Sequence, residues 1–254
     1  MQSARHHIYQ SLLWQAIIGA AIWLVSLILL REKPPTPPSS SSESDTKDIL
    51  KNLQLVVLNK NAMFLVLAFG LVLAFSNTYG SIAGILCLAF GYSDSVSSLF
   101  GICYIAGSVI GSICFGFVVE TQKVYKCATS VICLIGAVSS ASIAGMFYIK
   151  SLPLLYSSFF LTGSALALMP VGIDFAVELT HPVAEPISTG LLMSVGNFIG
   201  VILTLGIGVI IGKHDERGCY YSMAMLTGTA FLSFLCSLFI KEDLRRLKHE
   251  READ

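Results

Sequence analysis

Seven long apolar runs dominate the hydrophobic pattern of this 254-residue chain. Each run is continuous over roughly 18 or more residues, which is the length that a transmembrane helix needs. Strands of a membrane barrel would instead alternate apolar and polar residues. The pattern therefore predicts an all-α membrane protein with seven spans, over residues 12–30, 62–90, 96–119, 127–148, 152–178, 187–212 and 219–240.

Polar and small residues inside the runs predict local irregularities and close contacts. The polar stretch at residues 77–80 interrupts the second run, so this helix is predicted to be tilted or locally unwound. Pro170 lies inside the fifth run and predicts a kink there. Glycines four residues apart allow helices to approach closely, and we expect this role for the pairs Gly107/Gly111 and Gly196/Gly200.

The connection between the first and second runs, residues 31–61, differs in composition from the other connections. Four prolines and a serine tract follow Arg31, and this composition favours an extended, solvated backbone. From Asp45 onward, apolar residues return at helical spacing up to Val57. The pattern predicts a helix at the membrane interface, with Asp45 as its N-cap.

Composition and charge narrow the possible functions. The chain is 54% hydrophobic and 13% charged, and its formal net charge is zero, so charge does not indicate a nucleic-acid partner. Its seven cysteines show no metal-ligand spacing, and there is no nucleotide-binding loop or catalytic triad. We therefore expect a non-enzyme without a metal or cofactor, whose partner is the lipid bilayer rather than nucleic acid.

The distribution of basic residues predicts how the chain crosses the membrane. When the loops are assigned to alternating sides, twelve Lys and Arg residues fall on one side and four on the other. Basic residues concentrate in cytoplasmic loops. The bias therefore predicts that the loop at residues 31–61 and the C-terminus are cytoplasmic, and that the N-terminus faces the opposite side.

Seven spans with this orientation also occur in G-protein-coupled receptors. The first cytoplasmic loop here, however, is about 30 residues long, whereas receptors usually have a short one. The third run ends in GFVVETQKVYK, without an acidic-Arg-aromatic motif, and the last run lacks Asn-Pro-x-x-Tyr. These differences disfavour a receptor.

A long cytoplasmic loop followed by six spans is the arrangement at the centre of a twelve-helix major-facilitator carrier. On this interpretation, residues 1–30 correspond to helix six, and residues 31–61 form the central cytoplasmic loop with its interfacial helix. Residues 62–240 form the C-terminal six-helix transporter half, and residues 241–254 form a cytoplasmic tail. We therefore expect an N-terminally incomplete form of such a carrier.

Four segments carry a resemblance to one group of these carriers. GFVVETQKVYK (residues 116–126) resembles the loop motif of the superfamily. REKPPTPPSSS after the first run, GIDFAVELTHPVAEPISTGLL at residues 172–192 and KEDLRR after the last run are similar to the feline leukaemia virus subgroup C receptor-related solute carriers. The similarity extends over essentially the whole chain and is strongest to the branch named only for its major-facilitator domain. It implies transport of a choline-like or haem-linked solute.

The resemblance implies a solute site on the second and sixth runs. The choline carriers of this family place an aromatic residue in helix seven and a glutamine in helix eleven. Asn197 matches the glutamine position, whereas Ser76 stands at the aromatic position. Because a quaternary ammonium cage needs several rings, this departure disfavours choline itself. Asn77 and Tyr79 lie beside Ser76 and are further candidates for solute contact. Tyr79 is the candidate replacement for the missing aromatic residue. The alternative role for Asn197 and Tyr79 is hydrogen bonding between helices.

A second group of residues is predicted to form a cytoplasmic gate or charge network. It comprises Gly116, Glu120, Lys123, Asp174, Glu178 and Glu185. Gly116 allows a close helix approach, and Glu120 can accept hydrogen bonds at the interface. Asp174 and Glu178 lie one helical turn apart, and Glu185 follows after a short turn. Proton transfer is the alternative role for these carboxylates.

Two further expectations concern haem and the function of this chain on its own. The five histidines lie outside the predicted helix cores, so a buried haem site with two histidine ligands is not expected. A transport-inactive fragment or isoform is the alternative to a carrier. It would act by pairing with the missing N-terminal half or with a full-length carrier.

Overall fold

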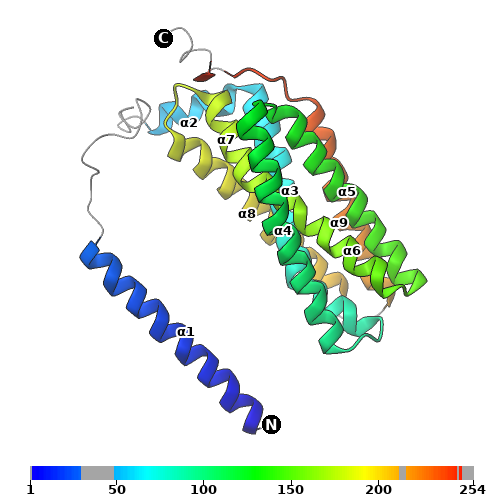
Figure 1. Cartoon of the computed structure of the whole chain (residues 1–254). Helices are drawn as coiled ribbons and strands as arrows, with labels where there is room; N and C mark the ends of the chain where they lie inside the picture. The colour runs from blue at the N-terminus through cyan, green and yellow to red at the C-terminus, as the bar shows by residue number, and fades with distance from the viewer. Residues whose placement is uncertain (1, 30–48, 212–215, 245, 248–254) are drawn as a thin grey trace. The chain divides into compact units, whose positions relative to one another are not determined.

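The computed structural model describes residues 2–29, 49–211, 216–244 and 246–247 (Figure 1). Asp45 and the Pro- and Ser-rich tract lie outside these ranges. The described helices are α1 (Gln2–Leu29), α2 (Ile49–Leu58), α3 (Lys60–Ala89), α4 (Asp94–Gln122), α5 (Tyr125–Ile149), α6 (Leu152–Ser164), the 3-10 turn η3 (Ala165–Ala167), α7 (Leu168–Thr180), α8 (Glu185–Ile211) and α9 (Glu216–Leu238). The described ranges contain no strand.

The chain divides into two units, residues 1–43 and 44–254. The described part of the first unit is α1, whose stretch Tyr9–Leu27 is long and apolar enough to span a membrane. Large apolar side chains such as Trp14 and Trp23 are exposed along this helix. This helix agrees with the predicted first run at residues 12–30 and has the length and composition of a membrane span.

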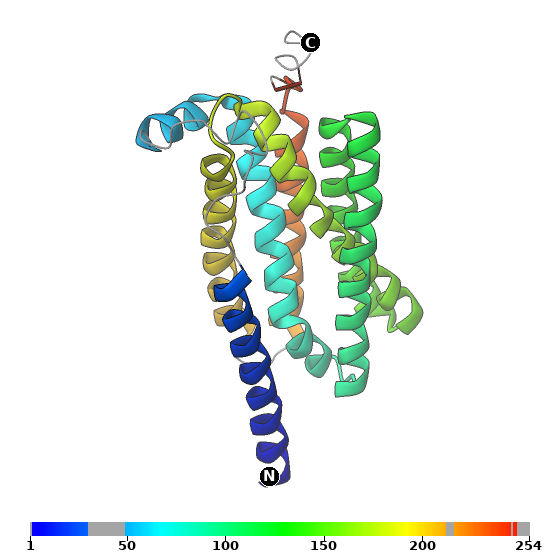
Figure 2. The same ribbon diagram turned by 60° about the vertical axis from the view of Figure 1, so that its left-hand side comes forward.

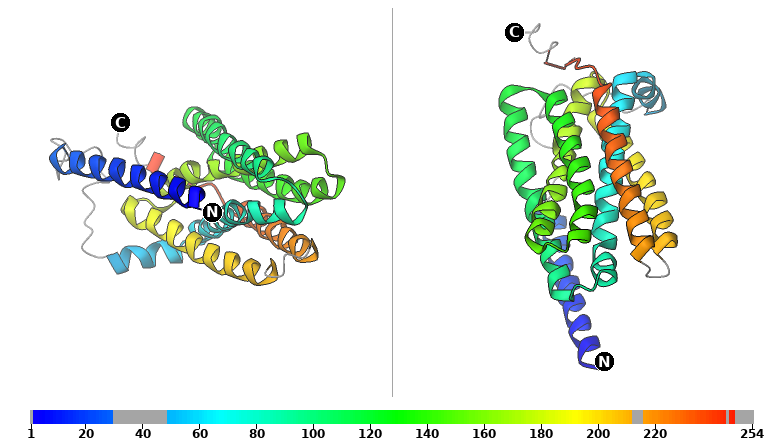
Figure 3. Two further views of the ribbon diagram at one scale, coloured as in Figure 1. Left: turned by 90° about the horizontal axis from the view of Figure 1, so that it is seen from below. Right: turned by 90° about the vertical axis from the view of Figure 1, so that its right-hand side faces the viewer.

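The second unit contains the other six candidate spans, which are α3, α4, α5, Leu152–Thr180, α8 and α9. Each agrees with a run predicted from the sequence. The central helix is α3, which packs against α8, α9, α4 and α7. Figure 2 shows α3 next to α8, and the view from below in Figure 3 shows α3 between α8 and α4. This arrangement buries most of α3, whereas α4 remains largely exposed.

The predicted local unwinding of the second run is wrong, because α3 continues as a regular helix through residues 77–80. Polar side chains in this stretch bond to their own helix. Thr78 Oγ1 donates to the Ala74 carbonyl oxygen at 2.8 Å, and Ser81 Oγ donates to the Asn77 carbonyl oxygen at 2.9 Å. Such bonds satisfy the hydroxyls inside a membrane without opening the helix.

The fifth span is interrupted where Pro170 predicts an irregularity. The turn η3 (Ala165–Ala167) separates α6 from α7, and Pro170 lies in the first turn of α7. Proline has no N–H to donate, and its ring crowds the carbonyl group four residues earlier, which belongs to Leu166. The fifth span therefore ends in a separate 13-residue α-helix, α7, which begins directly after η3.

Glycines bring two helix pairs into close contact, as the small-residue pairs predict. A Cβ atom on Gly107 would overlap the carbonyl group of Phe160 on α6, and one on Gly111 would lie 2.9 Å from Ser164. On α8, a Cβ atom on Gly196 would lie 3.2 Å from the Cα atom of Gly70 on α3. Packing at these distances requires glycine.

The helix predicted near the membrane interface is present as α2. Its Val56 is buried and packs with Ala62 and Val183, whereas Ile49 and Leu50 are exposed. The contact with Val183 joins α2 to the connection between α7 and α8. The location of this helix at a lipid surface stays a prediction.

Candidate functional site

A groove with a volume of about 280 Å³ lies between α3 and α8. Six residues from the two helices line it, namely Asn77, Asn197, Gly200, Val201, Thr204 and Leu205. Both amides that were predicted at the solute site are therefore at one groove. None of the six side chains is ionisable.

The close packing of α3 and α8 explains why these side chains share a groove. Gly196 contacts Gly70, and Gly200 lies beside Ala74, so the two backbones approach closely. Asn197 follows Gly196 and is rotated by about 100° around the helix axis. This rotation moves its side chain from the packed face to the neighbouring exposed face.

Both amides are available to a ligand. The Asn197 side chain is exposed, and its Nδ2 atom donates to the Met193 carbonyl oxygen of its own helix at 2.8 Å. Its Oδ1 atom accepts no hydrogen bond from the residues that the structure describes. Asn77 is also exposed, and its side-chain amide makes no hydrogen bond within the described ranges. These amide oxygens can therefore accept hydrogen bonds from a solute.

The groove lies near the middle of both helices. Asn197 is one residue from the centre of α8 (Glu185–Ile211), or about 1.5 Å along the axis. Asn77 is between two and three residues from the centre of α3 (Lys60–Ala89), or about 4 Å. In carriers built from two helical halves, solute sites lie near the bilayer midplane.

Ser76 and Tyr79, the other two predicted solute contacts, do not line this groove. Tyr79 is 1% exposed, and its hydroxyl lies 3.0 Å from Ser140 Oγ on α5. Ser76 is also buried, and its carbonyl oxygen accepts a hydrogen bond from the Tyr104 hydroxyl at 3.1 Å. The structure therefore gives Tyr79 a bond between helices, which was the alternative role.

Thr204 is a groove residue that the sequence analysis missed. Its Oγ1 atom lies 2.8 Å from Thr78 Oγ1, so it joins the two helices at the groove. The sequence does contain a signal, because Thr204 follows Asn197 by two helical turns and must lie on nearly the same face.

Four residues of the predicted charge network meet at a second cavity of about 180 Å³. They are Lys123, Asp174, Glu178 and Glu185. The other lining residues are Tyr125, Val177, Arg246 and Leu247. The cavity lies where the connection between α4 and α5 meets the end of α7 and the segment after α9.

Gly116 and Glu120 do not line this cavity. Nothing lies within 4 Å of the position that a Cβ atom on Gly116 would occupy, so the expected close approach is not formed among the described residues. Glu120 is exposed near the end of α4. An approach by another helix to this face stays a prediction.

No group of three or more His, Cys, Asp or Glu side chains in the described ranges is arranged to hold a metal ion. No disulfide joins any of the seven cysteines, all of which lie in the described ranges. The chemistry available at the groove is therefore hydrogen bonding by two amides and one hydroxyl, beside apolar side chains.

The relatives that match this chain in comparisons with known proteins are named as membrane transporters. No protein-family model matches the chain. The human choline/ethanolamine transporter FLVCR2 is 28% identical over 257 residues, covering 95% of this chain and 47% of the relative. The mouse (Mus musculus) choline/ethanolamine transporter FLVCR1 is 24% identical over 245 residues, covering 91% and 42%. The uncharacterized MFS-type transporter C09D4.1 of Caenorhabditis elegans is 23% identical over 249 residues, covering 93% and 41%.

The seven apolar helices and these relatives define a multi-pass helical membrane protein with a major-facilitator type of fold. Over about 90% of its length, the chain is similar to the choline/ethanolamine transporters FLVCR1 and FLVCR2. The chain spans about half the length of the curated relatives it matches.

Proposed function

We propose that this protein transports a small amino alcohol across a membrane, and that the groove of Asn77 and Asn197 forms one wall of the solute site. The observation that carries the proposal is the meeting of two exposed amides at the middle of α3 and α8. The similarity to FLVCR1 and FLVCR2, which are named choline/ethanolamine transporters, supports this solute class.

The composition of the groove suits such a solute. Amide oxygens accept hydrogen bonds from a hydroxyl or an ammonium group. Val201 and Leu205 offer apolar surface to methyl or methylene groups. None of the six residues that line the groove is aromatic, and a cage for a quaternary ammonium ion needs several rings, so the groove favours ethanolamine-like solutes over quaternary ammonium ions.

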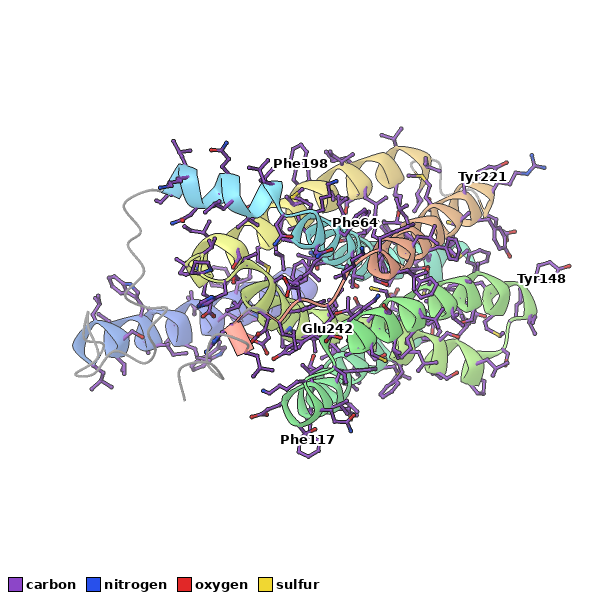
Figure 4. All side chains as sticks on the ribbon, turned by 90° about the horizontal axis from the view of Figure 1, so that it is seen from above. Phe64, Phe117, Tyr148, Phe198, Tyr221 and Glu242 are labelled. Carbon is purple, nitrogen blue, oxygen red and sulfur yellow. The ribbon has the colours of Figure 1, made fainter. Side chains whose placement is uncertain are left out.

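The opposite wall of the site comes from a second six-helix half. The groove is open on one side, and exposed apolar residues continue beside it along α8, among them Phe198, which is 68% exposed. Figure 4 shows Phe198 pointing away from the other helices of this unit. The relatives are about twice as long as the chain, which leaves room in them for such a half. Two halves rocking around a midplane site would expose it to each side in turn.

The proposed orientation places α2 and the segment after α9 in the cytoplasm. At that end of the second unit lie Lys51, Lys60, Lys123, Lys126 and Lys241. At the opposite end, the described basic residues are Lys150 and Arg217. This distribution supports the positive-inside orientation.

Uptake assays of the full gene product that contains this sequence test the proposal. Cells expressing it should accumulate labelled ethanolamine in preference to labelled choline. Asn197→Leu and Asn77→Leu should each weaken the apparent solute affinity by about tenfold, because each removes a hydrogen bond worth roughly 1.4 kcal/mol. Surface abundance should stay near normal, because neither amide bonds to another helix among the described residues.

Thr229→Leu is the matched control. Thr229 is a polar residue inside α9 that lies outside the groove, and its hydroxyl donates to the Met225 carbonyl oxygen of its own helix at 2.9 Å. It should leave the affinity unchanged. Reduced abundance with unchanged affinity in both amide variants would remove the groove from the solute site.

A further inference from the structure

The segment after α9 packs across one end of the helix bundle. Beyond Leu238 the chain turns, Ile240 is completely buried, and Leu244 packs against the hydrophobic core. Figure 4, which looks onto this end, shows the segment that carries Glu242 running across the helices. Residues 240–244 and 246–247 are called the strap.

One hydrogen bond ties the beginning of the strap to α3. The backbone N–H of Lys241 donates to Oδ1 of Asn61 in the first turn of α3, at 3.2 Å. The rings of Phe64 and Phe239 stack beside this bond, with their centroids 5.5 Å apart. This contact fixes the start of the strap over the start of α3.

A second hydrogen bond ties the far end of the strap to α7. The backbone N–H of Leu247 donates to Oε2 of Glu178 at 3.2 Å. The 180 Å³ cavity beside this bond is lined by Arg246 of the strap and by Asp174 and Glu185. A basic strap residue therefore lies in a cavity that three carboxylates line.

Hydrogen bonds from outside the helix tie the last turn of α7, the helix that the strap contacts. The 3-10 turn η3 lies between α6 and α7, so these two α-helices are separate segments of the fifth span. The last turn of α7 is tied to the strap through Glu178 and to the α2–α3 junction through Asn59, whose Nδ2 donates to the Leu179 carbonyl oxygen at 3.0 Å. A short helix that follows a 3-10 turn and is tied at its last turn can move when those ties are released.

We propose that the strap is a latch that holds α7 in its observed position and restrains the opening of this end of the solute pathway. The proposal rests on the transport function proposed above. Both ties use backbone N–H groups of the strap and side-chain acceptors of the bundle. The latch therefore depends on Asn61 and Glu178 more than on the identity of the strap residues they bind.

Hydrogen–deuterium exchange of the full gene product in lipid nanodiscs tests the latch. Glu178→Ala and Asn61→Ala should each speed backbone exchange in the strap by about fivefold or more, because each removes an acceptor. Glu178→Ala should also speed exchange in α7. Glu178→Gln keeps an acceptor oxygen and should stay close to the wild-type protein. Glu242→Gln changes an exposed charge of the strap without touching either tie, and is the control.

Transport measurements add an independent readout. At saturating solute, Glu178→Ala should change the transport rate per surface molecule by at least about twofold, and Glu178→Gln should restore it. Unchanged exchange in α7, or a normal transport rate despite a released strap, would overturn the latch. If the wild-type protein moves no solute, the proposed function fails, and the exchange of α7 still decides whether the strap holds it.

Discussion

The hydroxyls of Thr78 on α3 and Thr204 on α8 lie 2.8 Å apart, at the groove that Asn77 and Asn197 line. Thr78 also donates to the Ala74 carbonyl oxygen, so Thr204 supplies the hydrogen between the two side chains. This bond and the glycine contacts nearby fix the relative position of the helices that form the groove.

Replacing Thr204 by valine should destabilise the protein by about 1 kcal/mol, because a hydrogen bond between membrane helices contributes roughly 0.6 to 1.7 kcal/mol. Valine keeps the shape of the side chain and removes the hydroxyl. Thermal or denaturant unfolding of the purified protein measures the loss. Thr229→Val removes a hydroxyl that bonds to its own helix and should cost less. Equal losses would mean that the bond between α3 and α8 adds nothing.

The contact between α4 and α6 should be more sensitive to substitution. Gly107→Ala would place a methyl group into the backbone of Phe160, so the two helices must separate. We expect a loss of about 2 kcal/mol or more, in the range of overpacked sites. Gly101→Ala on the same helix is the control, because nothing lies within 4 Å of the new methyl group. Alanine has the higher helix propensity, so this variant should be neutral or more stable by up to about 1 kcal/mol.

The spans could be predicted from the sequence because continuous apolar runs of this length have few other stable arrangements. The break at Pro170 and the contact of Gly196 with Gly70 also follow from residue type, since proline lacks a donor and glycine lacks a side chain. Asn197 could be placed near the middle of its helix, because the position of a residue along a continuous helix follows from the two ends of that helix.

The orientation of side chains around α3 could not be predicted as well. This helix is apolar on almost every side, so its pattern does not distinguish the face toward the bundle from the face toward the groove. In the structure, Ser76 and Tyr79 are buried in the bundle, whereas Asn77 lies at the groove. The hydrogen bonds of the strap also could not be predicted from the sequence, because their donors are backbone N–H groups, which every residue except proline has.

The membrane orientation can be tested at two connections of the second unit. A glycosylation acceptor flanked by a flexible spacer would be inserted at Lys150, between α5 and α6, or at Lys123, between α4 and α5. Because the basic residues concentrate at the end that carries Lys123, only the insertion at Lys150 should be glycosylated in cells. Glycosylation at Lys123 alone would reverse the orientation, and glycosylation at both would contradict the helix count.

Tyr79 offers a separate test of which face of α3 meets the solute. Its hydroxyl bonds to Ser140 Oγ at 3.0 Å, and Ser140 Oγ in turn lies 3.1 Å from Thr227 Oγ1, so the three side chains link α3, α5 and α9. Tyr79→Phe should therefore lower the stability by about 1 kcal/mol. The apparent solute affinity should stay unchanged, because the ring is buried away from the groove.

Tyr148→Phe is the matched control for this substitution. Tyr148 is 81% exposed and is seen at the edge of the bundle in Figure 4, so removing its hydroxyl should change neither stability nor affinity. Uptake normalised to surface abundance and unfolding of the purified protein together separate the two roles of Tyr79. A tenfold weaker affinity in Tyr79→Phe with unchanged stability would mean that this hydroxyl contacts the solute during transport. Tyr79 would then belong to the solute site together with Asn77 and Asn197, and its hydroxyl would have to leave Ser140 to reach the solute.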